Sequence, residues 1–244
     1  MIRTVTAFHL VRRDLAGALR ELRGWAEAPR SAGKAFVALH LEAYVYALAR
    51  RPADARRAFA AAQKAAAAYH AERPESSSAY VEALAARDHP GRLESAVRRL
   101  EIERRAPGIS VPAGAPEVAS AMLLLARHEP AGAARILQSL GPIAFNRQNT
   151  GTSFLAAWLL SRSLWKLGRL GEAHAGYMET FRRRQVFDLH PEPAWFWPEF
   201  LAEASEVAFT AGRADDAALL RAQLAATRSA AAGMLSRRVN ILTP

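Results

Sequence analysis

The chain has 244 residues, 51% of them hydrophobic, which is enough for one large domain or one repeat array with a sizeable core. Lysine and arginine outnumber aspartate and glutamate by 33 to 23, giving a formal net charge of +10, and this balance favours an anionic partner or a set of solvated basic helix faces. No cysteine is present, which excludes disulfides and thiolate metal sites, and no apolar run reaches the roughly 18 residues of a membrane span.

The first residues, MIRTVTAFHLVRRDL, contain no long apolar stretch followed by a small-residue cleavage site. We therefore expect no secretory signal, and the lack of cysteine fits a cytoplasmic protein.

Two segments in the second half of the chain carry the clearest turn pattern. KLGRLGEA places Ala173 five residues after Gly168, and TAGRADDA places Ala217 five residues after Gly212. The glycine permits a tight reversal at the end of one helix, an acidic residue suits the start of the next, and the small alanine lets the two helices approach closely. Each segment therefore predicts a helical hairpin.

The same offset recurs earlier in the chain. HPGRLESA places Ala96 five residues after Gly91, while ARRPADARRAF and ARHEPAGAARIL resemble each other and use proline to begin the second helix. The recurring alanines are Ala18, Ala55, Ala96, Ala133, Ala173 and Ala217, with spacings of 37, 41, 37, 40 and 44 residues. We predict a period near 40 over residues 1–244, which form one domain.

A large apolar side chain follows each alanine by four residues in five of the six cases, and Arg221 is the exception. These side chains are Leu22, Phe59, Leu100, Leu137 and Tyr177. One turn apart on a helix, the two positions form a seam between paired helices. With almost no strand signals, we predict an all-α fold of about twelve helices in about six hairpins and no sheet.

Three connections are longer than a repeat needs: residues 106–116, 141–153 and 186–198. Loops of this length either carry function or absorb irregular stacking.

The hairpin pattern resembles the tetratricopeptide repeat, with large, small and aromatic residues on the first helix and alanine, aromatic and small residues on the second. The residues that carry it are Leu39, Ala43, Tyr46, Ala55, Phe59 and Ala62 in the second hairpin and Leu160, Ser161, Leu164, Ala173 and Tyr177 in the fifth. The resemblance covers nearly all of the chain, but four of the six copies match only in part. The period near 40 residues is also longer than that of the tetratricopeptide repeat, which is about 34 residues. The resemblance implies a right-handed superhelical solenoid whose first helices line a concave groove that holds a peptide or protein segment.

Groove positions implied by this resemblance are Trp158, Arg162, Trp165, Lys166, Glu206 and Phe209, with His40 and Tyr44 in the second hairpin. Aromatic and cationic side chains on one face suit an acidic or carboxylate-ended peptide, because arginine forks onto carboxylates and tryptophan contributes contact area. The alternative is that the two tryptophans, seven residues apart, are packing residues. For the run Trp195–Trp197 the same two interpretations apply, a partner anchor or core packing, and we favour packing.

Arg182, Arg183 and Arg184 follow two aromatic residues, and basic residues with aromatic neighbours suit a phosphate backbone. Arg228, Arg237 and Arg238 add charge to a C-terminal region without acids. No DNA-reading helix-turn-helix is evident.

The sequence contains no phosphate loop, no dinucleotide-binding glycine motif, no GxSxG and no HExxH. We therefore expect no enzyme activity, no metal and no cofactor. The leading hypothesis is a non-enzymatic adaptor that binds a protein or peptide in its groove. The alternatives are a nucleic-acid-associated helical repeat module and an array that assembles with itself through its ends.

Overall fold

The computed structural model describes residues 6, 9–12, 14–27, 35–69, 75–141, 150–183 and 191–239, and these are almost entirely helical. The helices are α2 (Leu15–Glu27), α3 (Ala35–Leu48), α4 (Pro52–Tyr69), α5 (Ser78–Ala85), α6 (Pro90–Arg105), α7 (Ala115–Ala126), α8 (Pro130–Ser139), α9 (Thr150–Lys166), α10 (Leu170–Arg182), α12 (Pro191–Thr210) and α13 (Ala214–Val239). The predicted all-α class is confirmed. Within the described ranges, extended pairing is limited to a two-residue parallel contact of β1 (Glu75–Ser76) with β2 (Ile109–Ser110).

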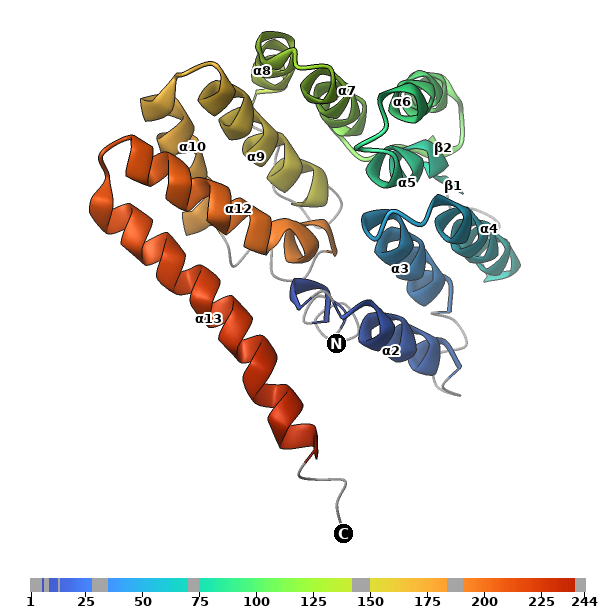
Figure 1. The fold of residues 1–244 in the computed structure, drawn as a ribbon. Helices are drawn as coiled ribbons and strands as arrows, with labels where there is room; N and C mark the ends of the chain where they lie inside the picture. The colour runs from blue at the N-terminus through green and yellow to red at the C-terminus, as the bar shows by residue number, and fades with distance from the viewer. Residues whose placement is uncertain are drawn as a thin grey trace.

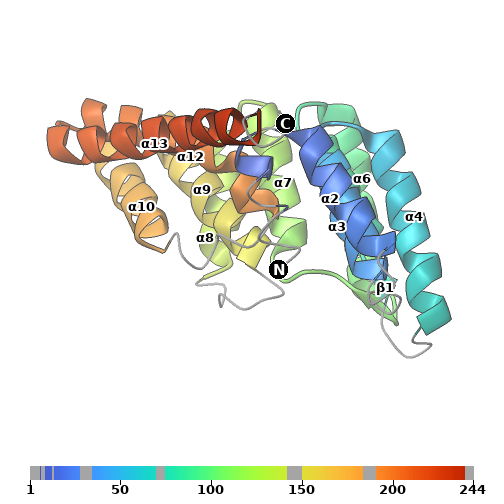
Figure 2. The same ribbon diagram turned by 90° about the horizontal axis from the view of Figure 1, so that it is seen from below.

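Neighbouring helices pack against each other in chain order, and alternate helices form an inner layer (Figure 1). In that layer α3 contacts α5, α5 contacts α7, α7 contacts α9 and α9 contacts α12. Helix α12 also contacts α3, so the inner layer returns to its own beginning. Seen at right angles, α13 lies along one edge, next to α12 (Figure 2). This closure brings side chains from the two halves of the chain to one central place.

Four hairpins share one turn geometry, although only two of them contain glycine at the turn. Gly168 and Gly212 have φ values of 74° and 71°, while Arg50 and His128 adopt φ 61° at the equivalent place. In each turn the next N–H donates to the carbonyl five residues back, at 2.8–2.9 Å, which ends the helix in a Schellman motif. Gly91 instead lies inside the first turn of α6 without positive φ, so its five-residue offset has a different structural cause.

This difference in turn residue predicts opposite effects of two substitutions. His128→Gly is expected to raise the free energy of unfolding by about 0.5–1 kcal/mol, because a residue with a Cβ is strained at positive φ. Gly168→Ala is expected to lower it by about 1 kcal/mol for the same reason, since open space surrounds Gly168. Urea unfolding of both variants checks this, and a shift of both in the same direction would contradict it.

The structure shortens the predicted loops. Helix α7 begins at Ala115, inside residues 106–116, and α9 begins at Thr150, inside residues 141–153. The third loop changes most. Residues 186–198 were expected to connect helices, but the chain is helical from Pro191 onward. Pro191 and Pro193 occupy the first turn of α12, where the N–H groups have no partner inside the helix, so proline is tolerated there. Residues 142–149 and 184–190, parts of two predicted long connections, lie outside the described residues.

The aromatic run at the start of α12 packs into the core, as the favoured interpretation predicts. Phe196 is buried and lies 5.1 Å from Trp158 between ring centroids, and Trp197 stacks on Phe200 at 5.0 Å. Trp195 is half-buried against the same core. Among the described helices, none is both long enough and apolar enough to cross a membrane.

Candidate functional site

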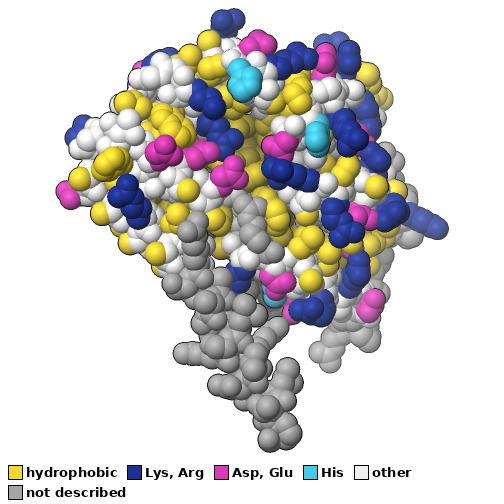
Figure 3. Space-filling model, in the orientation of Figure 1, with side chains coloured by type: hydrophobic (Ala, Val, Ile, Leu, Met, Phe, Trp, Pro, Cys, Tyr) yellow, Lys and Arg dark blue, Asp and Glu magenta, His cyan; other side chains and the backbone are white. Residues whose placement is uncertain are grey.

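A pocket of about 340 Å³ lies where α3, α5, α7, α9 and α12 meet. Figure 3 shows hydrophobic side chains at the base of this hollow and charged side chains around it. The volume is at the lower end of the roughly 300–1,000 Å³ of small-molecule sites. The closure of α12 onto α3 therefore creates a compact pocket at the centre of the inner layer.

The pocket walls divide into an apolar part and a charged part. The apolar side chains are Pro90, Met122, Leu125, Ala126, Leu155, Trp158, Leu159 and Phe196. The charged side chains are Arg50, Arg87, Asp88, Arg162, Lys166 and Glu199. Four of these six charges are positive and two are negative, so the lining carries an excess of two positive charges.

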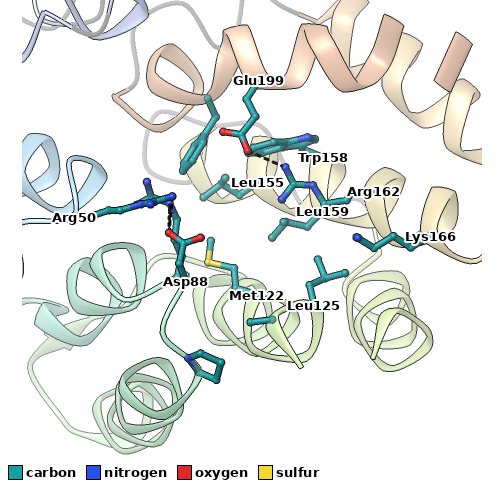
Figure 4. A pocket seen from close by; sticks show the side chains of 14 residues that line it. Arg50, Asp88, Met122, Leu125, Leu155, Trp158, Leu159, Arg162, Lys166 and Glu199 are labelled. Carbon is teal, nitrogen blue, oxygen red and sulfur yellow. Dashed lines mark hydrogen bonds and ion pairs between the residues drawn. The ribbon is translucent and has the colours of Figure 1, made fainter. Parts of the chain in front are cut away.

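Helix α9 supplies the largest share of the lining. Leu155, Trp158, Leu159, Arg162 and Lys166 recur at three- and four-residue spacing, so they form one stripe along the helix. The stripe changes from apolar to cationic towards the C-terminal end of α9, where positive charge is favoured by the helix dipole. Figure 4 shows Arg162 and Lys166 extending into the pocket from this helix.

Behind the pocket wall, Glu203 on α12 accepts hydrogen bonds from three side chains. Nε1 of Trp158 donates to its Oε2 at 2.8 Å, the hydroxyl of Tyr177 at 2.9 Å, and Nε of Arg162 at 3.1 Å. Nη2 of Arg162 also contacts Oε1 of Glu203. This cluster ties α9, α10 and α12 together and fixes the orientation of Arg162.

Titration of the cluster follows from its burial. Burial alone lowers the pKa of the Arg162 guanidinium, but the hydrogen bonds and charge of Glu203 outweigh that effect and raise this pKa. Burial, together with the negative charge of Glu203, raises the pKa of the Tyr177 hydroxyl. Arg162 is therefore a permanent cation and Tyr177 a permanent donor at physiological pH.

Glu199 on α12 and Lys166 on α9 complete the charged lining around Arg162. Oε1 of Glu199 lies 3.2 Å from Nη2 of Arg162, and the Glu199 side chain is 47% exposed. Among the described residues, no carboxylate lies within ion-pair distance of the Lys166 ammonium. The α9 side thus presents one cation with a half-exposed partner and one cation without a carboxylate partner.

The opposite wall is built at the C-terminal ends of α3 and α5. Arg87 donates to the carbonyl oxygens of Leu84 at 2.8 Å and Leu48 at 2.9 Å, and its guanidinium lies 5.2 Å from the ring centre of Phe196. Arg50 forms an ion pair with Asp88 at 2.7 Å. Arg87 therefore caps the C-terminal ends of α3 and α5 and contacts α12. These contacts hold the three helices together on this side of the pocket.

Of the predicted groove residues, the structure brings Trp158, Arg162 and Lys166 together in the pocket. Trp165, on the same helix, is half-buried against the core and does not line the pocket. Phe209 and Glu206, on α12, are exposed elsewhere, and the Phe209 ring lies 5.2 Å from the guanidinium of Arg221.

His40 and Tyr44 also lie away from the pocket. Their rings contact each other at 5.2 Å, His40 contacts Phe59 at 5.6 Å, and Tyr44 contacts Tyr80 at 6.3 Å. Both side chains are half-buried between α3 and its neighbours. They do not extend the surface formed by α9.

The predicted anionic-partner patch is described only in part. Arg182 and Arg183 are exposed at the end of α10, and Arg183 forms an ion pair with Glu179 at 2.6 Å. Arg184 lies outside the described residues, as do the side chains of Arg228, Arg237 and Arg238.

Sequence reasoning missed the pocket residues outside α9. Arg50 and Arg87 come directly after the apolar runs of α3 and α5, and arginine near a helix C-terminus is a signal for capping carbonyl oxygens. No comparable signal points to Met122, Phe196 or Glu199, because their meeting depends on the return of α12 to α3. In the described part of the chain, no group of three or more histidine, aspartate and glutamate side chains is placed to hold a metal ion.

In comparisons with known proteins, no family model matches the chain, and no curated protein and no solved structure matches it significantly.

Proposed function

We propose that this protein is a non-enzymatic adaptor, a divergent tetratricopeptide-like array that binds an acidic segment of a protein partner at its central pocket. The observation that carries the proposal is the pocket's composition, an apolar base beneath a lining with two excess positive charges. A partner segment that combines an apolar side chain with a carboxylate complements both parts. The net charge of +10 supports attraction of such a segment at longer range.

The expected strength follows from the two kinds of contact. Full burial of one apolar side chain contributes about 1.5–3 kcal/mol, and a charge-assisted hydrogen bond contributes about 1.5–3 kcal/mol. Together they contribute about 3–6 kcal/mol before the cost of association, so a short segment that makes one contact of each kind is expected to bind no more tightly than about tens of micromolar. Weak, charge-sensitive binding suits an adaptor that exchanges partners.

Selection of random displayed peptides on the purified full chain tests this function. We expect enrichment of peptides with a carboxylate next to a large apolar side chain, because that pair fills the apolar base and meets Lys166. Binding is expected to be lost in Ala126→Trp, which adds a bulky side chain to the pocket lining from α7. It is also expected to be lost in Lys166→Glu, which reverses the charge of a cation that has no carboxylate partner among the described residues.

Arg98→Glu is the matched charge-reversal control, because Arg98 is an exposed cation on α6 that does not line the pocket. Peptides that bind all four proteins equally, or that carry basic consensus sequences, would refute the assignment of the pocket. Circular dichroism verifies that each variant keeps its helical content.

The alternative partner is a nucleic acid bound by the basic surface. It rests on the net charge and on Arg182, since Arg183 is already paired with Glu179. This alternative predicts binding to single-stranded nucleic acid that weakens steeply with salt and persists in Ala126→Trp. Titrations at low and high salt with both proteins separate it from the adaptor function.

A further inference from the structure

The positive charge of the pocket is distributed unevenly between its two sides. On the α3 and α5 side, Asp88 pairs with Arg50, and Arg87 is occupied by helix-end carbonyls. On α9, Arg162 pairs with Glu199 within the pocket lining, and Lys166 has no carboxylate partner among the described residues. The excess charge that a ligand would meet is therefore concentrated on α9.

Arg162 has one amino group that its carboxylate partners do not use. Its Nε and Nη2 groups donate to Glu203 and Glu199, whereas Nη1 makes no hydrogen bond with the described residues. Lys166 follows Arg162 by four residues, so the two cations lie one helical turn apart on the same face. Two cations with unused donors, one turn apart, are able to donate to the same anionic group.

Glu199 holds its place on Arg162 weakly. It makes a single 3.2 Å contact and is 47% exposed, while Glu203 is 18% exposed and receives bonds from three side chains. Loss of the Glu199 contact would leave Arg162 paired with Glu203. Glu199 is therefore a carboxylate that another anion can replace without leaving a buried charge unpaired.

We propose that the pocket binds a small organic anion, a carboxylate or sulfonate on a flat apolar body, and that its charged group replaces Glu199 on Arg162 while also meeting Lys166. The flat body lies against Met122, Trp158 and Phe196, which line the pocket. The guanidinium of Arg162 lies 4.3 Å from the centre of the Trp158 ring, so the ligand meets this ring at its edge. The thioether of Met122 forms a favourable contact with a planar ligand. The volume of about 340 Å³ suits a ligand of two fused rings. The inference uses the same pocket as the proposed function but needs no protein partner.

Calorimetric titration of the purified full chain with 2-naphthalenesulfonate tests the proposal, because this probe is ionised at all working pH values. We expect saturable binding of one probe per chain. The neutral 2-naphthalenemethanol is expected to bind at least about 10-fold more weakly, and the 2-naphthylmethylammonium cation not at all, because they lack the charge that the α9 cations receive.

Two exposed charges give opposite expectations. Glu199→Gln removes the internal competitor and is expected to tighten binding about 3- to 10-fold, whereas Lys166→Gln is expected to weaken it by a similar factor. Ala126→Trp is expected to abolish binding, and Arg98→Gln to leave it unchanged. Tighter binding of the sulfonate by Glu199→Gln cannot result from a general loss of structure, because unfolding would weaken binding.

Equal binding of the sulfonate and the neutral alcohol, or no gain of affinity in Glu199→Gln, would overturn the proposal. The test also separates it from the adaptor function. If displayed peptides bind in the pocket but the sulfonate does not bind, the small-anion proposal is refuted and the adaptor function stands. Binding of the sulfonate with no selected peptide would reject the protein partner alone, and displacement of a selected peptide by the sulfonate would support both.

Discussion

Replacing Glu203 with methionine is expected to lower the free energy of unfolding by about 3–5 kcal/mol. Methionine preserves the apolar stem of the side chain but removes the acceptor for Trp158, Arg162 and Tyr177. A mostly buried guanidinium then loses its closest partner, and a buried hydroxyl and indole N–H lose their acceptor. Urea unfolding followed by circular dichroism measures the loss.

Glu199→Gln is the matched control for this prediction. Glu199 contacts the same guanidinium from α12, but it is half-exposed and accepts from Arg162 alone among the described residues. Its substitution is expected to change the free energy of unfolding by less than about 1 kcal/mol. Similar losses in Glu203→Met and Glu199→Gln would show that Glu203 is not the centre of the cluster.

Arg87→Met is expected to lower the free energy of unfolding by about 2–3 kcal/mol. The substitution leaves the carbonyl oxygens of Leu84 and Leu48 without their side-chain donor and removes a cation from the ring of Phe196. Because these contacts join α3, α5 and α12, the same variant is expected to increase amide hydrogen exchange in α12 before global unfolding.

Arg50→Met provides the comparison for Arg87. Arg50 is 59% exposed and pairs with Asp88 at the pocket surface, so its loss is expected to cost less than about 1 kcal/mol. Equally small losses of stability in Arg87→Met and Arg50→Met, with unchanged exchange in α12, would show that Arg87 does not hold α12 against α3 and α5.

The sequence predicted the elements better than their arrangement. Glycine at Gly168 and Gly212 identified two turns directly, because positive φ strongly favours glycine. At Arg50 and His128 the same turn forms without glycine, and only the similarity of the two surrounding segments indicated it. Helix class and turn position are local properties, so they could be derived from local patterns.

The sequence could predict only those pocket residues that lie on one helix. Trp158, Arg162 and Lys166 share a face of α9 by their spacing, and the structure places them in one pocket. Phe196 and Glu199 reach the same pocket because α12 returns to α3, a long-range contact that no local spacing encodes. Trp165 illustrates the converse, since helical spacing alone did not distinguish a pocket-lining tryptophan from one packed against the core.

Methionine-methyl NMR tests the central claim, that the partner segment binds in the pocket, most directly. Met122 lines the pocket on α7, whereas Met178 is buried in α10 away from it, so one labelled sample contains both reporter and control. On titration with the tightest displayed peptide, we expect the Met122 methyl resonance to shift in proportion to saturation and the Met178 resonance to stay in place. Saturated binding with Met122 unmoved would contradict the assignment of the pocket as the binding site.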